Sequence, residues 1–550
     1  MKRIAKMCQS KIILKRKKYF KYTVIAIVMF IFLSGCSKAV TTSDVSKQKP
    51  WQNEAQSERE TDNVYEVATV RWADWGEMYH QGFPDKAAED AGIVINWNTI
   101  LFEDWGNRKE VLLAGSDLPD AFMGSICFSE ADILNNTDTF IALDSYIDEY
   151  MPNFKKIMES DPVMKTLATS SDGHIYGLPS KKPCRPIVAN QMFINQTWLN
   201  NLGLDMPKTY DEFVEVLRAF KEKDANGNGD PNDEIPFGEG FADSVMYFCI
   251  PFGVTPGGEG TYLMAIKDKE PAFIPASEEY KKGIAAMHMC YEEGLIDQEI
   301  FTQDDSMRDA KLMNETPIVG CAPGWTVDAL FGKNSDQYVA LPALIGPDGN
   351  QYISSDPQHW NYSRYEFMVT SFCKNPEKIL SWIDTFYTED ASIQNFYGSF
   401  GIGVEKDQKS GNYKVLEAKE MSADLFAWVY SLRDFGPKYV ADGFEQKVTY
   451  EGNNGDAAKL KLDENMRQYQ KEAYPNVSYT AEQLSQLDLI YTDIINYVNM
   501  KQASWVTQGD IEEQWQEYIG TLRQMGYDDF LKIQKDVYDS YKETGKNVND

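Results

Sequence analysis

The segment TYDEFVEVLRAFKEKDANGNGDPNDEIPF, residues 209–237, joins the pattern of a helix directly to a loop rich in oxygen side chains. Thr209 and Glu212 have the spacing of a capping box, which marks the start of a helix. Apolar residues then recur with helical periodicity and predict one buried face: Phe213, Val216, Leu217 and Phe220. The sequence therefore predicts a helix that ends where the oxygen-rich loop begins.

The loop has the alternation of oxygen donors that wraps a calcium ion. Counted from Asp224, oxygen side chains stand at positions 1, 3, 5 and 7 and a glycine at position 6, as in an EF-hand loop. Position 12 is Ile235 rather than glutamate, so the acids at positions 10 and 11 must complete the shell. The predicted ligands of a structural Ca²⁺ are Asp224, Asn226, Asn228, Asp230, Asp233 and Glu234.

Two other interpretations of this loop stay open. It could be a turn of Asn and Gly residues that holds no ion, or it could hold a catalytic metal. The four histidines are dispersed and form no H-E-x-x-H motif, which argues against a catalytic metal. A calcium enclosed by protein ligands would instead fix the end of the helix to a strand near Ile235.

The first 35 residues have the parts of a bacterial lipoprotein signal peptide. A basic block at residues 15–21 precedes the apolar run YTVIAIVMFIFL, residues 22–33, which has the length of a signal-peptide core. The run leads into LSGC, residues 33–36, which looks like a lipobox. Lipoprotein processing at a lipobox acylates the cysteine and cuts before it, so Cys36 would be the first mature residue. The alternative is an ordinary signal peptide with a chance cysteine. Residues 36–62 are polar and predict a disordered tether. We expect an extracytoplasmic protein anchored only by lipid to the outer face of a Gram-positive cell membrane.

The charge balance and the cysteines exclude several classes of protein. The chain carries 84 acidic and 54 basic residues, and residues 1–35 hold nine of the basic and none of the acidic ones, so the mature chain carries about −39 charges. This charge argues against nucleic acid as a partner. Six cysteines beyond Cys36 are scattered without a C-x-x-C pair, which argues against zinc and leaves one disulfide open.

Residues 64–125 alternate strand and helix patterns, as a parallel α/β sheet does. Residues 64–75 predict a strand that opens into an aromatic loop, and residues 92–100 and 120–123 predict two more strands. Ligands bind at the carboxyl ends of such strands, which points to Trp72 and Trp75. Two amphipathic patterns, in residues 509–526 and 527–545, predict C-terminal helices that pack on a core.

Several segments, taken in order, resemble a known family. They are LLAGSDLPDAF (112–122), DGHIYGLP (172–179), residues 192–238, YEEGLIDQEIFTQD (291–304) and GYDDFLKIQKDVYDSY (526–541). The chain resembles the extracellular solute-binding proteins of bacterial ABC importers, family 1. Within that family it is similar to the calcium-containing lipoproteins related to alginate-oligosaccharide binding proteins, although its loop has one extra residue between the glycine and the acid pair.

The resemblance implies an α/β fold of the type II periplasmic-binding class, with two lobes, several crossings between them and a helix-rich C-terminal part. Lobe 1 would comprise residues 63–185 and 355–403. Lobe 2 would comprise residues 186–354 and 404–550, and it would contain the calcium loop at 224–234. The two lobes of this class close on a ligand like a hinged trap.

The resemblance also implies a function. The protein would be a monomeric, non-catalytic lipoprotein that captures an oligosaccharide and delivers it to the transmembrane subunits of an ABC importer. Sugars bind to aromatic rings and to polar side chains, so loop aromatics and polar residues near the crossings are candidates. The predicted ligand-binding residues are Trp72, Trp75, Asn190, Trp325, Trp360, Arg364 and Tyr397, with core packing as the alternative for the aromatic ones.

Two other functions fit the same sequence. The first is a secreted carbohydrate-active enzyme with a structural calcium, and the second is a peptide-binding or adhesin lipoprotein of the same fold. Carboxylate pairs alone do not support the enzyme, because acidic residues are abundant throughout this chain. The sequence also contains no G-x-S-x-G nucleophile motif and no G-x-G-x-x-G dinucleotide motif.

Overall fold

The computed structural model describes residues 63–549 with gaps at 79–81, 116–117, 184–187, 189, 242, 258–261, 355–360, 420, 422, 453–454, 476 and 478. The predicted signal peptide, Cys36, the tether, Cys184 and Trp360 lie outside the described residues. The other five mature cysteines are buried, and no disulfide links any of the residues described. None of the described helices has both the length and the hydrophobicity that crossing a membrane requires.

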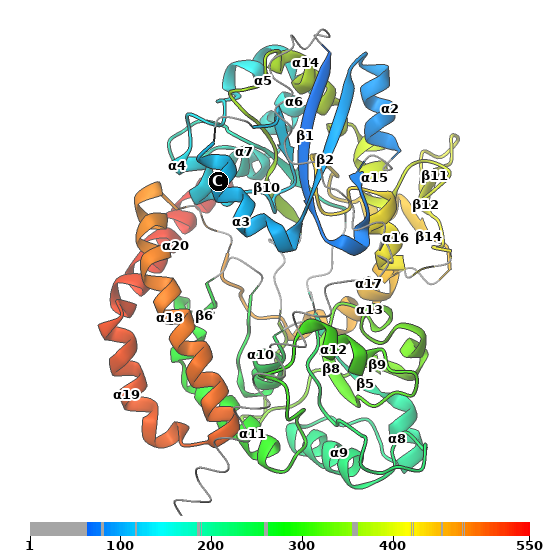
Figure 1. Ribbon diagram of the computed structural model, residues 1–550, viewed down its shortest axis with the longest axis vertical. Helices are drawn as coiled ribbons and strands as arrows, with labels where there is room; N and C mark the ends of the chain where they lie inside the picture. Colours follow the sequence, from blue (N-terminus) through cyan, green and yellow to red (C-terminus); the bar gives the residue numbers. More distant parts are fainter. Residues whose placement is uncertain are drawn as a thin grey trace, which may run out of the picture. The chain divides into compact units, whose positions relative to one another are not determined.

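A six-stranded sheet organises the first half of the fold, and Figure 1 labels its strands β1, β2 and β10. The strand order is β13-β4-β10-β3-β1-β2. Its strands are β1 (Val64–Arg71), β2 (Val94–Leu101), β3 (Ala121–Met123), β4 (Leu178–Lys181), β10 (Tyr362–Val369) and β13 (Lys438–Tyr439). β1 runs parallel to β2 and to β3, which confirms the predicted parallel strands. β10 runs antiparallel between β3 and β4, and β13 pairs parallel with β4. The carboxyl ends of β1, β2 and β3 therefore lie at one edge of this sheet.

Helices cover both faces of the six-stranded sheet. The helices of this half are α2 (Phe83–Asp90), α3 (Phe102–Leu113), α4 (Glu130–Asn135), α5 (Asp144–Tyr150), α6 (Pro152–Ser160), α7 (Pro162–Ala168), α14 (Pro376–Asp384), α15 (Glu389–Tyr397) and α16 (Ala423–Tyr430). Among them, α4 also contacts α18. On one face Trp382 of α14 packs against Trp97 and Phe367, and on the other Trp105 of α3 packs against Phe122. Because both faces are covered, the last five residues of β1 are all buried.

A smaller antiparallel sheet, β8-β5-β9, organises the second half of the fold. Its strands are β5 (Gln191–Asn195), β8 (Cys321–Gly324) and β9 (Tyr338–Ala340), and a separate hairpin consists of β6 (Met264–Lys267) and β7 (Glu270–Phe273). The helices here are α8 (Gln196–Leu202), α9 (Tyr210–Glu222), α10 (Ser244–Cys249), α11 (Glu278–Glu292), α12 (Asp305–Leu312) and α13 (Val327–Phe331). This half has its own hydrophobic core, which includes Trp198, Leu217 and Ile284.

The C-terminal part is helical, as the amphipathic patterns predict. It contains α17 (Gly455–Met466), α18 (Ala481–Gln508), α19 (Ile511–Gln524) and α20 (Tyr527–Asn549). Figure 1 shows α18 and α19 (orange to red) beside α11, while α20 contacts α18, α19 and β7. Trp505 of α18 and Trp515 of α19 pack into the core of the second half. A third sheet contains β11 (Val404–Lys406), β12 (Tyr413–Val415) and β14 (Val448–Tyr450). The 3₁₀ helices are η1 (Ala73–Trp75), η3 (Ile250–Phe252), η4 (Ile274–Ala276), η5 (Gly332–Gln337), η6 (Thr385–Tyr387), η7 (Phe444–Gln446) and η8 (Arg467–Tyr469).

The predicted lobe boundaries stay a prediction, and the segment after residue 404 bears on them. Within that segment, β13 pairs with β4 in the six-stranded sheet, and Leu432 packs into the same core as Val67 and Trp382. Residues 474–538 contribute instead to the core of the second half. The segment from residue 404 to the C-terminus therefore contributes side chains to both cores.

The predicted capping box at the start of α9 is present in full. Thr209 accepts a hydrogen bond from Glu212 N at 3.1 Å, and the Glu212 carboxylate accepts one from Thr209 N at 3.3 Å. Thr209→Ala removes the first of these bonds and is expected to lower the free energy of unfolding by about 1 kcal/mol. Urea denaturation measures this change, and an unchanged midpoint would show that the cap does not stabilise α9.

Candidate functional site

Five aromatic rings gather at the carboxyl ends of β1 and β2; we refer to them as the aromatic shelf: Trp72, Trp75, Phe102, Trp428 and Phe435. Trp75 and Trp428 stack face to face, with ring centroids 3.6 Å apart and planes 8° apart. Trp72 stacks on Phe102 at 4.5 Å and touches Trp75 at 4.4 Å. All five side chains keep part of their surface exposed. The shelf therefore offers a continuous, partly exposed aromatic surface.

Arg71, the last residue of β1, holds the two central rings of the shelf in place. Its buried guanidinium donates to the carbonyl oxygens of Trp75, Gly76 and Trp428. Burial lowers the pKa of Arg71 to about 10, which still leaves it charged at neutral pH. One cation thus links the loop after β1 to the end of α16, two segments more than 350 residues apart in sequence.

A buried pair of opposite charges lies against the shelf. Glu366 of β10 is 0% exposed, and its Oε2 accepts hydrogen bonds from Ser125 N at 3.1 Å and Gly436 N at 2.8 Å. Lys438 of β13 donates to the carbonyl oxygens of Phe435 and Gly436. Burial raises the pKa of Glu366 and lowers that of Lys438 to about 7, while the charge of each group favours the charged form of the other. The pair therefore fixes the backbone that carries Phe435.

Asn190 and Trp325, both predicted from sequence, lie at one edge of the smaller sheet. The pairing of Gln191 with Gly324 brings the residue before β5 next to the residue after β8. Asn190 and Ser354 hydrogen-bond with the Tyr247 hydroxyl, whose pKa burial raises to about 12. The Lys459 ammonium group lies over the Trp325 ring, 4.2 Å from the ring centroid, in a cation–π contact. This edge therefore combines an aromatic ring with amide and hydroxyl groups.

Two other predicted residues are held by contacts within the fold. Arg364 pairs with Glu130 at 2.9 Å and donates to carbonyl oxygens of residues 167 and 169. Tyr397 is 4% exposed in a core with Phe396, and its hydroxyl lies 3.1 Å from that of Tyr450. These contacts explain both residues as packing groups, so neither is included in the site proposed below.

The oxygen-rich loop folds around its own polar groups. Glu234 Oε1 accepts from Ala225 N at 2.8 Å, and Asp224 Oδ2 accepts from Gly229 N at 2.9 Å. The Asp233 carboxylate accepts from the side-chain amides of Asn226 and Asn228. The other oxygens of the first two acids, Asp224 Oδ1 and Glu234 Oε2, are buried without a hydrogen-bond partner among the described residues. Burial raises the pKa of Glu234, as expected for a carboxylate that lacks a compensating positive charge.

The donor set of the loop suits a hard cation better than a transition metal. No group of three or more His, Cys, Asp or Glu side chains in the described part of the chain is arranged to hold a metal ion. The loop supplies asparagine and carboxylate oxygens instead, which are calcium ligands. After the loop, Ile235 N donates to Ile318 O and Ile235 O accepts from Gly320 N, so the loop connects the end of α9 to the segment that leads into β8.

Comparison with known sequences links the chain to one family of transport proteins. The sequence pattern of the family described as bacterial extracellular solute-binding protein matches residues 71–263. The fructooligosaccharide ABC transporter substrate-binding protein FusA of Streptococcus pneumoniae serotype 4 is 32% identical over 476 residues, which are 82% of this chain and 86% of FusA. Lipoprotein LipO of Bacillus subtilis is 27% identical over 355 residues, which are 60% of this chain and 64% of LipO.

Solved structures agree with the sequence comparison. FusA in complex with kestose superposes with a TM-score of 0.78 at 28% identity, covering 88% of this chain and all of FusA; an EF-hand mutant of FusA with fructo-nystose superposes equally well. A solute-binding protein of Bifidobacterium longum infantis that binds human milk oligosaccharides gives a TM-score of 0.74 at 27% identity, covering 87% and 99% of the two chains. These likenesses confirm the predicted two-lobed α/β fold.

The sequence identified only part of the aromatic shelf. Trp72 and Trp75 follow a recognisable strand, whereas Phe102, Trp428 and Phe435 were not predicted. Phe102 begins a helix directly after β2, so the rule about carboxyl ends of strands could have found it. Trp428 and Phe435 lie in an ordinary apolar stretch, and no local signal connects them to β1.

Proposed function

The chain belongs to the bacterial extracellular solute-binding proteins, and from this premise we propose that it captures an oligosaccharide outside the cytoplasm and delivers it to an ABC importer. The observation that carries the proposal is the aromatic shelf at the carboxyl ends of parallel strands. Pyranose and furanose rings present C–H faces that pack on aromatic rings, and ligands of open α/β sheets bind at this edge. FusA, the relative at 32% identity, is a fructooligosaccharide-binding protein.

The ligand is held between two groups of side chains in this proposal. The aromatic shelf packs on one face of a sugar unit, while Asn190 and Trp325 contact the ligand from the edge of the smaller sheet. The six-stranded sheet and its helices form one lobe and the smaller sheet with the C-terminal helices forms the other, so closure of the lobes brings both groups onto the ligand. Trp360 follows Ser354 closely in sequence and stays a further candidate.

The proposed activity is binding without catalysis. Delivery of the oligosaccharide to the importer follows from the proposed lipid anchor at the outer face of the membrane. Cleavage of a glycosidic bond needs two carboxyl groups flanking that bond, whereas the aromatic shelf consists of apolar rings. Two observations support acylation of Cys36: residues 33–36 resemble a lipobox, and the relative LipO is a lipoprotein. A monomer tethered by residues 36–62 would then reach the transmembrane subunits of the importer at the outer face of the membrane.

A structural Ca²⁺ in the loop at residues 224–234 is part of the proposal. Two buried oxygens without partners among the described residues, Asp224 Oδ1 and Glu234 Oε2, support it because desolvated carboxylates need a positive charge. Carboxylate oxygens of Asp233 and amide oxygens of Asn226 and Asn228 would complete the shell after rotation of the amides, with Asp230 contributing at position 7. The existence of an EF-hand mutant of FusA is consistent with a site of this kind.

Removal of calcium is expected to lower the thermal stability of the protein. An ion present at 100 times its Kd contributes about 2.7 kcal/mol to the folded state, so EDTA should lower Tm by several degrees and added Ca²⁺ should restore it. Glu234→Gln keeps an acceptor for Ala225 N but removes the charge, and it should abolish most of the EDTA response. Scanning calorimetry measures both effects.

The control for this experiment is Asp348→Asn. Asp348 lies in an exposed turn, where it accepts hydrogen bonds from Asn350 and Tyr352, outside the predicted calcium loop. This variant should respond to EDTA like the unmodified protein. A Tm that is the same with and without EDTA would show that the loop holds no calcium.

Titration calorimetry tests the proposed function directly. The purified protein is titrated with kestose, nystose, lacto-N-tetraose and a mixture of short peptides, and mass spectrometry then examines the recovered sugars. Saturable binding of an intact oligosaccharide supports the proposal. Shortened sugars would indicate an enzyme, and binding of peptides alone would indicate a peptide-binding protein of the same fold.

A further inference from the structure

Three segments in the second half of the fold end at the edge that carries Trp325. Residues 235–241 run parallel to residues 318–323, and Phe241 N donates to Pro323 O at 3.0 Å. Residues 237 and 296 form another parallel bridge, so the segment leading to α12 leaves in the same direction. Glycine is required at position 240 for this approach, because a Cβ there would lie 1.8 Å from Pro323 O. The topology thus places residues 239–241, the start of α12 and Trp325 near one another.

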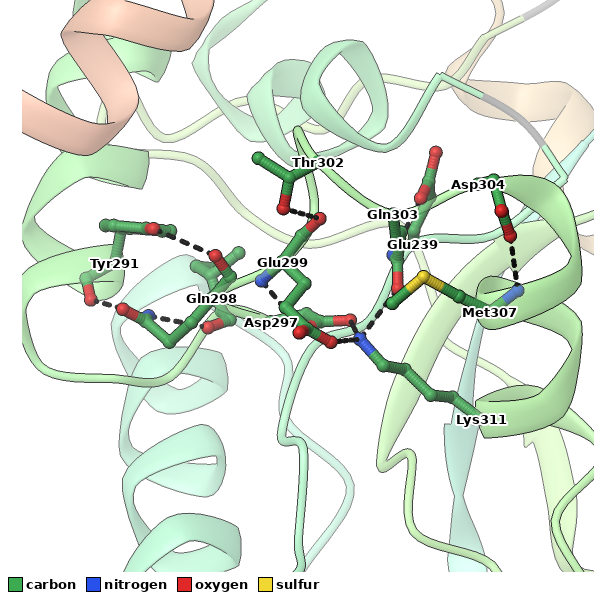
Figure 2. A network of polar contacts seen from close by, with 11 residues as sticks. Glu239, Tyr291, Asp297, Gln298, Glu299, Thr302, Gln303, Asp304, Met307 and Lys311 are labelled. Atoms are coloured by element: carbon green, nitrogen blue, oxygen red, sulfur yellow. Dashed lines mark hydrogen bonds and ion pairs between the residues drawn. The ribbon is translucent and has the colours of Figure 1, made fainter. Parts of the chain in front are cut away.

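A polar network holds Glu239 at this edge. Figure 2 shows Lys311 of α12 reaching both the carboxylate of Asp297 and the side chain of Gln303, at 2.7 Å in each case. Gln303 in turn donates to Glu239 Oε2 at 2.7 Å. Asp297 is buried, so its carboxylate holds the Lys311 ammonium group at the inner end of the network. Partial burial raises the pKa of Glu239, although the nearby Arg308 charge favours its ionised form.

Phe241 and Arg308 lie beside this carboxylate. The Phe241 side chain is 40% exposed, which is unusual for a phenylalanine. The Arg308 guanidinium carbon lies 4.8 Å from the ring centroid of Phe241. Arg308 is oriented by Asp305 at 2.8 Å and Asp309 at 3.0 Å, both within its own helix. The helix therefore presents the guanidinium to the ring without help from the rest of the fold.

Two partly exposed polar atoms of this cluster are available to a ligand and match a sugar. Among the described residues, Glu239 Oε1 has no donor and Arg308 Nη2 has no acceptor, and the Phe241 ring is exposed beside them. A sugar unit supplies hydroxyl groups for both polar atoms and a C–H face for the ring. We propose that Phe241, Arg308 and Glu239 form a second sugar subsite, which binds another unit of the oligosaccharide that the aromatic shelf binds. This inference rests on the proposed function.

Titration of a tetrasaccharide against matched variants tests the subsite. Nystose is titrated into the full chain, into Phe241→Ala, Phe241→Tyr and Glu239→Gln, and into Met307→Ala, which truncates another exposed apolar side chain of α12. Phe241→Ala should raise Kd about 10-fold, since the ring contributes on the order of 1–2 kcal/mol by burial. Phe241→Tyr and Met307→Ala should bind like the unmodified protein, and Tm should stay within a degree in all variants.

The outcomes separate this inference from the function on which it rests. If the unmodified protein binds nystose and both Phe241→Ala and Glu239→Gln keep its Kd within twofold, the subsite is refuted while the proposed function stands. If the unmodified protein binds none of the glycans tested, the proposed function fails and the subsite fails with it. A loss of affinity in Phe241→Ala that Phe241→Tyr restores, at unchanged Tm, supports the subsite.

Discussion

Alanine in place of both Trp75 and Trp428 is expected to weaken oligosaccharide binding about 100-fold or more, because each ring contributes about 1.5–2 kcal/mol when a ligand buries it. The two rings stack at 3.6 Å and form the centre of the aromatic shelf. Each single substitution should cost about 10-fold and also disturb its stacking partner, so the double variant isolates the contribution of the stack. Titration calorimetry with kestose or nystose measures the change.

The structure offers a way to separate binding from folding in this experiment. Arg71 donates hydrogen bonds to the carbonyl oxygens of both residues, so the backbone of the shelf should persist in the double variant. Its guanidinium also lies 5.6 Å from the centroid of the Trp75 ring, and the double variant loses this cation–π contact. Phe372→Ala removes an exposed aromatic side chain outside the shelf and should leave Kd unchanged. An unaltered Kd in the Trp75 and Trp428 double variant would refute the assignment of the shelf as the ligand-binding surface.

Lys438→Met is expected to lower the free energy of unfolding by up to about 3–5 kcal/mol, since the buried Glu366 carboxylate loses the stronger of two stabilising positive charges and keeps only that of Lys182. Glu366 is fully buried and holds the backbone N–H groups of Ser125 and Gly436. Methionine fills a volume similar to that of lysine but cannot donate to the Phe435 and Gly436 carbonyl oxygens. Urea denaturation at constant pH measures the loss.

A second substitution provides the matched control. Glu366→Gln in the Lys438→Met background removes the buried charge but retains an oxygen that can accept from the same two N–H groups. The double variant should therefore recover most of the lost stability, as neutral replacements of buried ion pairs commonly do. Equal stability of the single variant and the unmodified protein would show that the pair contributes little to this fold.

The elements with short-range signals were predicted well from the sequence. The capping box of α9, the parallel strands β1, β2 and β3, and the amphipathic helices α19 and α20 all depend on residues a few positions apart. The positions at which strands begin and end depend on pairing with distant segments. For example, β5 begins at Gln191 because its pairing with β8 starts opposite Gly324. The oxygen alternation of the loop is also a short-range signal, but the calcium ligands inferred from it stay a prediction.

The candidate site was predicted only in part. Trp72 and Trp75 could be found because they follow a strand, and Asn190 and Trp325 do lie at one sheet edge. Tyr397 adjoins a glycine-rich loop and is a candidate for that reason, yet its ring packs into a core with Phe396. A turn and a buried helix end have similar composition, so the sequence could not distinguish an exposed aromatic ring from a buried one at this position.

The sequence alone determined the first three strands, the capped helix α9, the last two helices and the composition of the oxygen-rich loop, because caps, periodicity and turn residues act over a few positions. Only the tertiary structure decided which aromatic rings meet. Trp75 and Trp428 come together because β10 and β13 enter the sheet of β1 from distant parts of the chain, and Arg71 then binds both backbones. Such contacts depend on strand pairing and core packing across hundreds of residues, and these are properties of the folded chain rather than of any local pattern.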